Sequence, residues 1–344
     1  MMKKVFLILL LSLSIGSCSN LSAINPLAQI NQDDCVLFIH DPSEKREIWF
    51  SCDGRDSQIL VAGIQNVQDF AAADNANEIY FTLPNDNGGT DIWFISKQKN
   101  EPSLLVDCGN STCGDLTYNS ESNRLAYTES GNNSILDLLD LVNDSTKSYP
   151  YSASDLAFSP NGNYLSFFDS SREKLVALDL STDNHFEEDS QEGLIGGWSS
   201  DSRLFLYGAT DYWGGIPGTN MFVLNLNTGN SEMIIDGSKN LVEYYRPLFY
   251  QPADSIITAV RERSSGFTRQ LWLINSDGNP ETQITSDFTY DNSSAQLNTG
   301  QTKLVFQRYN INRSDSQPEV WIYDFSSGEL IKVAENAAHP QWIP

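Results

Sequence analysis

Basic residues are scarce in this chain of 344 residues. It contains 21 Lys and Arg against 45 Asp and Glu, which gives a formal net charge of −24. Loss of a leader carrying Lys3 and Lys4 would remove two positive charges and take the net charge from −24 to −26. Non-specific binding of nucleic acid needs the opposite sign of charge, so we expect no nucleic-acid partner. The acidic residues are scattered through turns, which favours a role in solubility over an acidic binding site.

Motifs of catalysis are also missing. Histidine occurs three times, at His40, His185 and His339, and the chain has no HExxH, GxSxG or glycine-rich phosphate loop. The loop Asn85–Asp91 is rich in oxygen ligands but lacks the downstream glutamate of an EF-hand, so we expect an ordinary hairpin loop there. We therefore assign no catalytic residue, no cofactor and no metal ligand. Catalysis by scattered carboxylates, as in a hydrolase or a lyase, stays open.

Only one long apolar run is present, from Val5 to Ile15, and it is too short to span a bilayer. It ends in Ile15-Gly16-Ser17-Cys18, which resembles the lipobox of bacterial lipoproteins. The resemblance implies cleavage before Cys18 and acylation of Cys18, and several acyl chains on one residue anchor a protein stably. An ordinary signal peptide is the alternative.

This reading divides the chain into three parts. We expect a signal peptide at 1–17, a lipidated cysteine with a flexible tether at 18–33, and a folded body at 34–344. Ser19 directly after the cysteine implies, by the same resemblance, an outer-membrane lipoprotein that faces the periplasm or the cell surface.

The other four cysteines indicate disulfide bonds. Cys35 and Cys52 flank a predicted hairpin, and they lie opposite one another if His40 faces Glu47. Cys108 and Cys113 are close enough in sequence to close a small ring. A zinc site built from the four thiolates is the weaker alternative, because no CxxC spacing is present and an exported protein meets an oxidising environment.

A repeated β unit organises the body. In its clearest copy, runs at 155–159, 164–168 and 175–180 each have the composition of a short strand, and Pro160-Asn161-Gly162 between the first two is a turn signal. Complete units are spaced roughly 40 to 50 residues apart, a period typical of propeller blades. Six complete units begin at Asp69, Asp115, Asp155, Gly196, Arg246 and Ser294.

Two incomplete units remain at the ends of the body. Residues 35–63 contain later strands without an inner strand, and His339–Pro344 is an inner strand with nothing after it. Together they supply one further unit, and a closed ring removes the exposed edges of an open sheet. The sequence therefore predicts an all-β, seven-bladed β-propeller in which the N- and C-terminal strands share one blade.

Phe158–Phe167, and more weakly Trp198–Leu206, are similar to the WD40-like repeat of TolB-type periplasmic propellers. The resemblance covers nearly the whole body and implies an architecture rather than a function. The chain departs from TolB itself, because we find no separate N-terminal α/β domain.

One face of the predicted ring is rich in arginine and aromatic residues, a composition typical of interface hot spots. We expect an anionic ligand or an acidic protein segment to dock there. Internal pairing of the arginines with nearby carboxylates is an equally weighted alternative. The candidate ligand-binding residues are Tyr212, Trp213, Tyr244, Tyr245, Arg246, Arg261, Arg263, Arg269, Arg308 and Arg313.

The sequence therefore predicts a monomeric, lipid-anchored envelope propeller that acts as a non-catalytic scaffold for a protein or peptide. Binding of a cell-wall or extracellular polysaccharide is the alternative, with tyrosine and tryptophan rings stacking on sugars. An enzyme with acidic catalytic groups is the third possibility.

Overall fold

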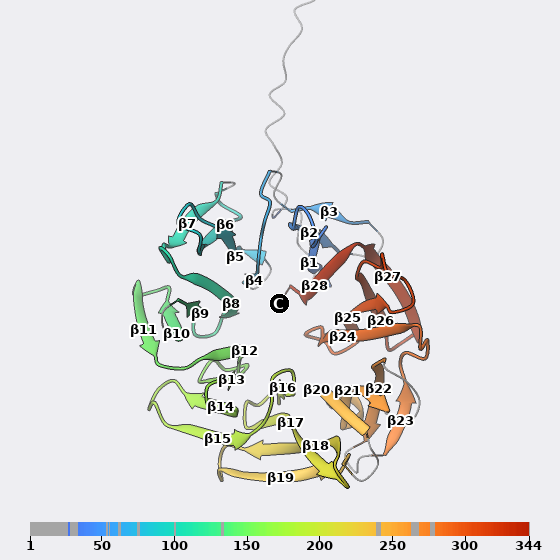
Figure 1. The fold of residues 1–344 in the computed structure, drawn as a ribbon. Helices are drawn as coiled ribbons and strands as arrows, with labels where there is room; N and C mark the ends of the chain where they lie inside the picture. Colours follow the sequence, from blue (N-terminus) through green and yellow to red (C-terminus); the bar gives the residue numbers. More distant parts are fainter. Residues whose placement is uncertain are drawn as a thin grey trace, which may run out of the picture.

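A computed structural model shows an all-β ring around a central opening (Figure 1). It describes Leu27 and residues 34–52, 54, 56–60, 63–73, 76–99, 101–131, 134–238, 242–262, 268–275 and 279–343. The predicted signal peptide and Cys18 lie outside the described residues. Within these ranges, no helix has the length and apolar character needed to cross a bilayer.

Five four-stranded antiparallel sheets stand around the ring as blades, each with one strand beside the central opening (Figure 1). From the innermost strand outward they are β28 (Ala337–Trp342), β1 (Val36–His40), β2 (Glu47–Ser51) and β3 (Gln58–Ile59); β12 (Ala153–Phe158), β13 (Tyr164–Asp169), β14 (Lys174–Asp179) and β15 (His185–Asp189); β16 (Ile195–Trp198), β17 (Leu204–Trp213), β18 (Ile216–Asn225) and β19 (Asn230–Ile235); β20 (Val242–Tyr250), β21 (Ser255–Glu262), β22 (Gln270–Asn275) and β23 (Pro280–Gln283); and β24 (Tyr290–Leu297), β25 (Lys303–Asn310), β26 (Glu319–Asp324) and β27 (Glu329–Glu335). A short 3-10 helix, Gln251–Ala253, joins β20 to β21.

The other eight strands form one sheet. They are β4 (Phe70–Ala72), β5 (Glu78–Pro84), β6 (Thr90–Ser96), β7 (Ser103–Val106), β8 (Thr112–Asn119), β9 (Arg124–Ser130), β10 (Ser134–Asp140) and β11 (Ser145–Tyr149). The antiparallel groups β4–β7 and β8–β11 meet where Thr90 of β6 pairs in parallel with Thr112 of β8.

The prediction of seven separate blades is therefore wrong, because the described strands form five four-stranded blades and one eight-stranded sheet. Hydrogen bonds at Thr90 explain the difference. Its N–H donates to the carbonyl oxygen of Ser111 at 3.1 Å, and its Oγ1 donates to that of Cys113 at 2.6 Å. A strand pattern specifies pairing within a hairpin but carries no signal for this contact between two hairpins.

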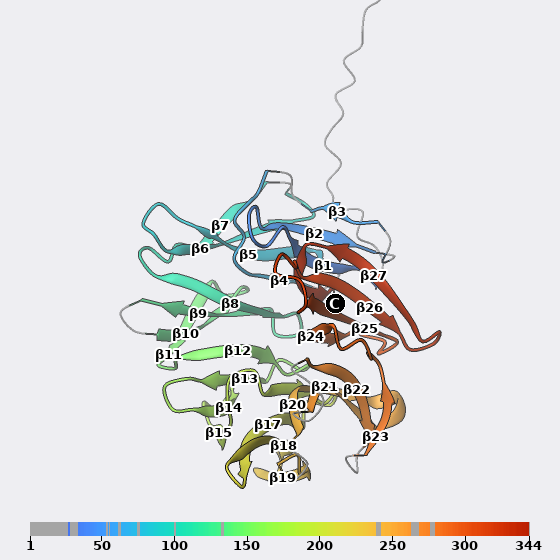
Figure 2. The ribbon, with the colours of Figure 1, turned by 45° about the vertical axis from the view of Figure 1, so that its right-hand side comes forward.

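The predicted closure of the ring by both ends of the body is confirmed. In the β1–β28 pair, Val36 lies opposite Trp342 and Leu37 lies opposite Gln341. The C-terminus lies close to β1 and β24 in two views (Figures 1 and 2). The ring is thus closed by backbone hydrogen bonds rather than by a covalent bond.

Both predicted disulfide bonds are present, which excludes the zinc alternative. Val36 faces Ser51 and His40 faces Glu47, so Cys35 and Cys52 meet just beyond the strand ends and are bonded. Cys108 is bonded to Cys113.

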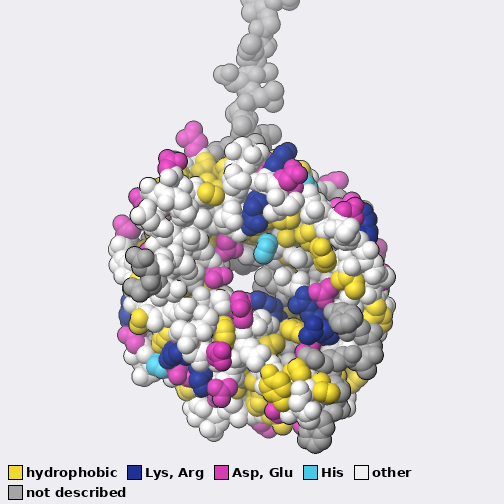
Figure 3. Space-filling model, in the orientation of Figure 1, with side chains coloured by type: hydrophobic (Ala, Val, Ile, Leu, Met, Phe, Trp, Pro, Cys, Tyr) yellow, Lys and Arg dark blue, Asp and Glu magenta, His cyan; other side chains and the backbone are white. Residues whose placement is uncertain are grey.

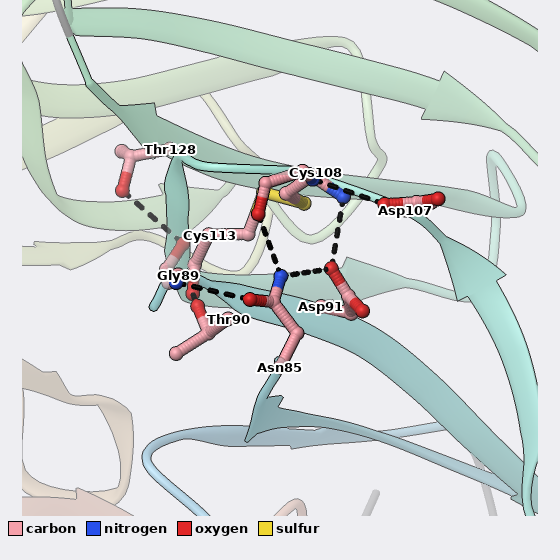
Figure 4. The surroundings of a disulfide bond; sticks show 10 residues. Asn85, Gly89, Thr90, Asp91, Asp107, Cys108, Cys113 and Thr128 are labelled. Atoms are coloured by element: carbon pink, nitrogen blue, oxygen red, sulfur yellow. Dashed lines mark hydrogen bonds between the residues drawn. A yellow bond between two sulfur atoms is a disulfide. The ribbon is translucent and has the colours of Figure 1, made fainter. Parts of the chain in front are cut away.

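The loop that closes the Cys108–Cys113 ring is held by the β5–β6 hairpin (Figure 4). Asn85 Nδ2 donates to Asp91 Oδ1 at 2.7 Å and to the carbonyl oxygen of Gly109 at 2.8 Å. Asp91 Oδ1 also accepts the backbone N–H of Cys108 at 3.0 Å. The segment Asn85–Asp91 is therefore a hairpin loop between β5 and β6, as expected, and its side chains form hydrogen bonds within the loop and to the disulfide ring.

Apolar side chains fill the spaces between neighbouring groups of strands. One cluster joins Val36 and Phe38 of β1 to Val305 of β25 and Val320 of β26, across the closure of the ring. Another contains Leu27, which is fully buried against β1 and β4 although it falls in the segment predicted to be a flexible tether. At Leu27 the chain is therefore docked on the propeller.

Candidate functional site

The innermost strands share an irregularity near one mouth of the central opening. In β8 the pairing register shifts by one position between Gly114 and Thr117. Equivalent shifts occur in β12, β16, β20 and β24. The extra residue of such a bulge is unpaired, so its side chain can be redirected. Four residues at these shifts have positive φ angles: Asp115 at 50°, Asp155 at 56°, Arg246 at 46° and Ser294 at 51°. His339 of β28 has a φ of 53°.

These residues line a cavity of about 450 Å³ at the centre of the ring, together with Asp69. A second cavity of about 480 Å³ extends over β20 and β21 and is lined by Tyr245 and Arg269. Arg246 and Ser294 line both cavities. We call the two cavities together the central cleft. Figure 3 shows acidic side chains on one side of the opening, basic side chains on the other, and a histidine at its edge.

The acidic side of the central cleft contains two carboxylates without an ion-pair partner among the described residues, Asp69 and Asp115. Asp69 accepts the backbone N–H groups of Phe70 at 2.8 Å and Leu116 at 2.5 Å. Burial raises the pKa of Asp69 to about 6. Asp115 is exposed to the cleft and accepts a long hydrogen bond from Thr128 Oγ1 at 3.4 Å.

Charge in this part of the cleft is poorly compensated. Partial desolvation within the cleft raises the pKa of the Asp115 carboxyl, and the neighbouring Asp155 carboxylate raises it further. His339 does not supply the missing positive charge, because desolvation and the nearby Arg46 lower its pKa. The acidic side therefore favours a ligand that carries a cation or several hydrogen-bond donors.

Arg246 and Asp155 form an ion pair across the mouth. Asp155 belongs to β12 and Arg246 to β20, with β16 between them in the ring (Figure 1). Gly196 of β16 also lines the cavity. A Cβ atom at Gly196 would lie 2.5 Å from the carbonyl oxygens of Leu206 and Pro247, so the strand requires glycine.

Most of the predicted arginines are paired internally. Arg261 pairs with Glu243, Arg269 with Asp291, and Arg313 with Asp315 at 3.4 Å. Arg308 is only 5% exposed, and its guanidinium lies 4.3 Å from the ring centre of Tyr290 and 5.0 Å from that of Trp321. Arg263 lies outside the described residues. The described arginines thus follow the alternative of internal pairing more closely than that of a free anion site.

The predicted aromatic residues do not form one surface. Tyr212 is 62% exposed on the β17–β18 hairpin, where Trp213 lies opposite Ile216. Tyr244 is buried in the core between blades. Tyr245 lines the central cleft, with Arg261 and Arg269 close to its ring at 5.6 and 5.4 Å. Of the predicted set, the structure brings together Tyr245, Arg246 and Arg269 at the central cleft.

Sequence reasoning missed Asp69, Asp115, Asp155 and His339 as cleft residues. A signal was present, because each of them begins an inner-strand segment in the alignment of the repeats. Aspartate also tolerates the left-handed conformation that a bulge requires better than most residues do. In the part of the chain that the structure describes, no group of three or more His, Cys, Asp or Glu side chains is placed to hold a metal ion.

Comparison with known sequences gives no assignment. No protein-family pattern and no curated protein matches the chain.

Solved structures match in fold. The β-propeller domain of the Trilobed protease from Pyrococcus furiosus matches with a TM-score of 0.61 and 11% identity over 89% of this chain and 96% of that chain. TolB from Acinetobacter baumannii matches with a TM-score of 0.50 and 16% identity over 79% and 68%. Oligogalacturonate lyase from Vibrio parahaemolyticus matches with a TM-score of 0.51 and 12% identity over 78% and 73%.

Identities this low establish only a common architecture. The expected resemblance is thereby confirmed at the level of fold: the chain is a β-propeller similar to that of TolB.

Proposed function

We propose that this protein is a non-catalytic binding protein that holds a polypeptide segment in the central cleft. The observation that carries the proposal is the presence of both signs of charge along one continuous cleft. Asp69 and Asp115 offer carboxylates that have no ion-pair partner among the described residues. Arg246 and Arg269, each paired with one aspartate, supply positive charge on the other side. The rigid ring presents these groups from several strands at once, which suits recognition at several points.

A polypeptide fits this cleft better than a polysaccharide does. An acidic polysaccharide would meet the carboxylates of Asp69 and Asp115 with charge of the same sign. A neutral polysaccharide binds largely by stacking on aromatic rings, and Tyr245, the aromatic residue among the described cleft-lining side chains, has Arg261 and Arg269 against its ring. A polypeptide carries amines, guanidinium groups and carboxylates on one chain and can match both sides.

We place the protein in the cell envelope, attached by a lipid at Cys18. The lipobox-like Ile15-Gly16-Ser17-Cys18 and the apolar run before it support this location. Two disulfide bonds are consistent with an oxidising compartment. Metabolic labelling with palmitate tests the anchor: the wild-type chain should incorporate label, and Cys18→Ser should not.

Site-specific photo-cross-linking tests the binding role. Ser294 is a suitable position, because it lines both cavities of the central cleft. Val142 is a matched control on a surface turn, 71% exposed. We expect a protease-sensitive adduct in intact envelopes from position 294 and not from position 142. A protease-resistant adduct degraded by glycosidases would instead favour a polysaccharide, and equal labelling at both positions would contradict the proposal.

The absence of catalysis needs a separate test, because an oligogalacturonate lyase and the propeller domain of a protease share the fold. The purified protein should leave oligogalacturonate and a peptide mixture unchanged when the products are followed by mass spectrometry. Turnover that is lost in Asp115→Asn would assign an enzyme with acidic groups in its place.

A further inference from the structure

We propose that the Arg246–Asp155 ion pair is exchanged for ligand contacts, so that the central cleft selects polypeptide segments carrying a cation close to a carboxylate. The inference rests on the proposed function and specifies its ligand. In the exchange, the carboxylate of the ligand takes Arg246, and its ammonium or guanidinium group takes the place of Arg246 beside Asp155.

The two members of the pair differ in how firmly they are held. Asp155 is 12% exposed, and its Oδ2 accepts the backbone N–H of Gly193 at 3.0 Å. Arg246 has a side chain that is 48% exposed, and among the described residues its guanidinium donates a hydrogen bond to Asp155 alone. The half-exposed guanidinium can turn toward water or another partner, whereas the largely buried Asp155 carboxylate would then need a replacement cation. Arg246 is therefore the movable member, and Asp155 is the fixed one.

The position of Arg246 couples the pair to occupancy of the cleft. Arg246 lines the cavity that contains Asp69 and Asp115, and it also lines the cavity that contains Tyr245 and Arg269. Its side chain pairs with Asp155 of β12 from β20, two inner strands away around the ring, and it borders both cavities. A segment that occupies both cavities therefore lies beside this side chain.

Charge balance then determines the class of ligand. Arg246 is the cation nearest to Asp155, and it also lowers the pKa of Asp115, against the raising effects of burial and Asp155. A ligand with only a carboxylate would remove Arg246 and leave Asp155 and Asp115 uncompensated next to each other. A ligand with only a cation that displaced Arg246 from Asp155 would leave Arg246 without a carboxylate partner. A ligand with both groups replaces each lost contact.

A set of four blocked pentapeptides tests the exchange by calorimetric titration. The parent is acetyl-Gly-Lys-Gly-Glu-Gly-amide, and the others carry Gln in place of Lys, of Glu, or of both. We expect the parent to bind at least about tenfold more tightly than either singly charged peptide, the ratio given by one favourable ion pair.

Two variants of the protein test whether Arg246 causes the preference for the parent peptide. In Arg246→Gln, the advantage of the parent over the peptide that lacks Glu should disappear. Arg313→Gln is the control, because Arg313 also pairs with one aspartate but lies outside the central cleft. Its peptide affinities should equal those of the wild type.

The outcomes separate the two proposals. If the peptide with Lys alone binds as tightly as the parent, the exchange is wrong while peptide binding stands. If no peptide binds but position 294 still cross-links to a polypeptide, the exchange is again wrong, because it requires only a short dipolar segment. If no peptide binds and position 294 gives no polypeptide adduct, the proposed function fails as well.

Discussion

Trp342 of the last strand lies opposite Val36 of the first strand, and its indole N–H donates to the carbonyl oxygen of Gln296 at 2.9 Å. One side chain near the C-terminus therefore ties β28 both to its own blade and to β24 in the neighbouring blade. The side chain is 7% exposed, in the apolar cluster that closes the ring. Closure of the ring thus depends on packing at a point where no covalent bond acts.

Replacement of this tryptophan should weaken the closure of the ring. We expect Trp342→Ala to lower the free energy of unfolding by about 3–5 kcal/mol, the range for removing a buried large aromatic side chain. Urea denaturation followed by circular dichroism measures the change. Val142→Ser, on an exposed turn, is the control and should change stability by less than about 0.5 kcal/mol. A Trp342→Ala protein as stable as this control would show that the last strand does not close the ring.

The two disulfide bonds should differ in their contributions to stability. They close loops with sequence separations of 17 and 5 residues. The loss of chain entropy in the unfolded state predicts about 3 kcal/mol for the longer loop and about 2 kcal/mol for the shorter one. We therefore expect Cys35→Ser with Cys52→Ser to lower the melting temperature more than Cys108→Ser with Cys113→Ser. The reverse order would mean that the hydrogen bonds of Asn85 and Asp91 to the smaller ring depend on its disulfide.

Leu27 should behave as a core residue rather than as part of a free linker. Its side chain is fully buried with Leu37, Phe70 and Ile79. Leu27→Ala should cost about 2–5 kcal/mol, because it deletes a buried leucine and leaves a cavity. Hydrogen exchange should also become faster in β1 and β4. An unchanged melting temperature would show that the segment is not docked at this position in solution.

Much of the fold was predictable because local chemistry specifies it. Cys35 was predicted to lie opposite Cys52 on the condition that His40 faces Glu47, and the structure shows both that register and the disulfide bond. The missing inner strand before Val36 predicted that the last residues would supply it. The pairing of Thr90 with Thr112 was not predictable, since it joins two hairpins through backbone atoms that any residue carries.

The candidate site was less predictable, although part of its signal was visible. The sequence leaves open whether the arginines of this face bind a ligand or pair internally, and in the structure Arg261 and Arg269 each have a carboxylate partner in or beside the same blade. Composition indicates which charges a face carries but not which of them are already paired. The sequence shows that an aspartate recurs at the start of the inner strands. It does not show the bulges that turn Asp115 and Asp155 toward the centre.

Asp69 should make stability depend on pH in a direction opposite to that of an ordinary salt-bridged aspartate. Burial raises its pKa from 3.8 to about 6, so the folded protein holds the proton more tightly than the unfolded chain does. The contribution of Asp69 to the free energy of unfolding is therefore greatest below its unfolded pKa and is lost as the pH rises through about 6. Asp69→Asn cannot titrate, so the stability of the wild type relative to this variant should fall between pH 4 and pH 7.

The Asp324→Asn variant is the matched control for this titration. Hydrogen bonds from Ser326 hold the pKa of Asp324 below its ordinary value, so its contribution changes only at pH values below about 4. Relative to this variant, the wild type should keep a constant stability difference between pH 5 and pH 7. Carbon NMR of the Asp69 carboxyl gives a direct measurement, and a midpoint near 4 would show that the acidic side of the central cleft is well solvated and needs no cation from a ligand.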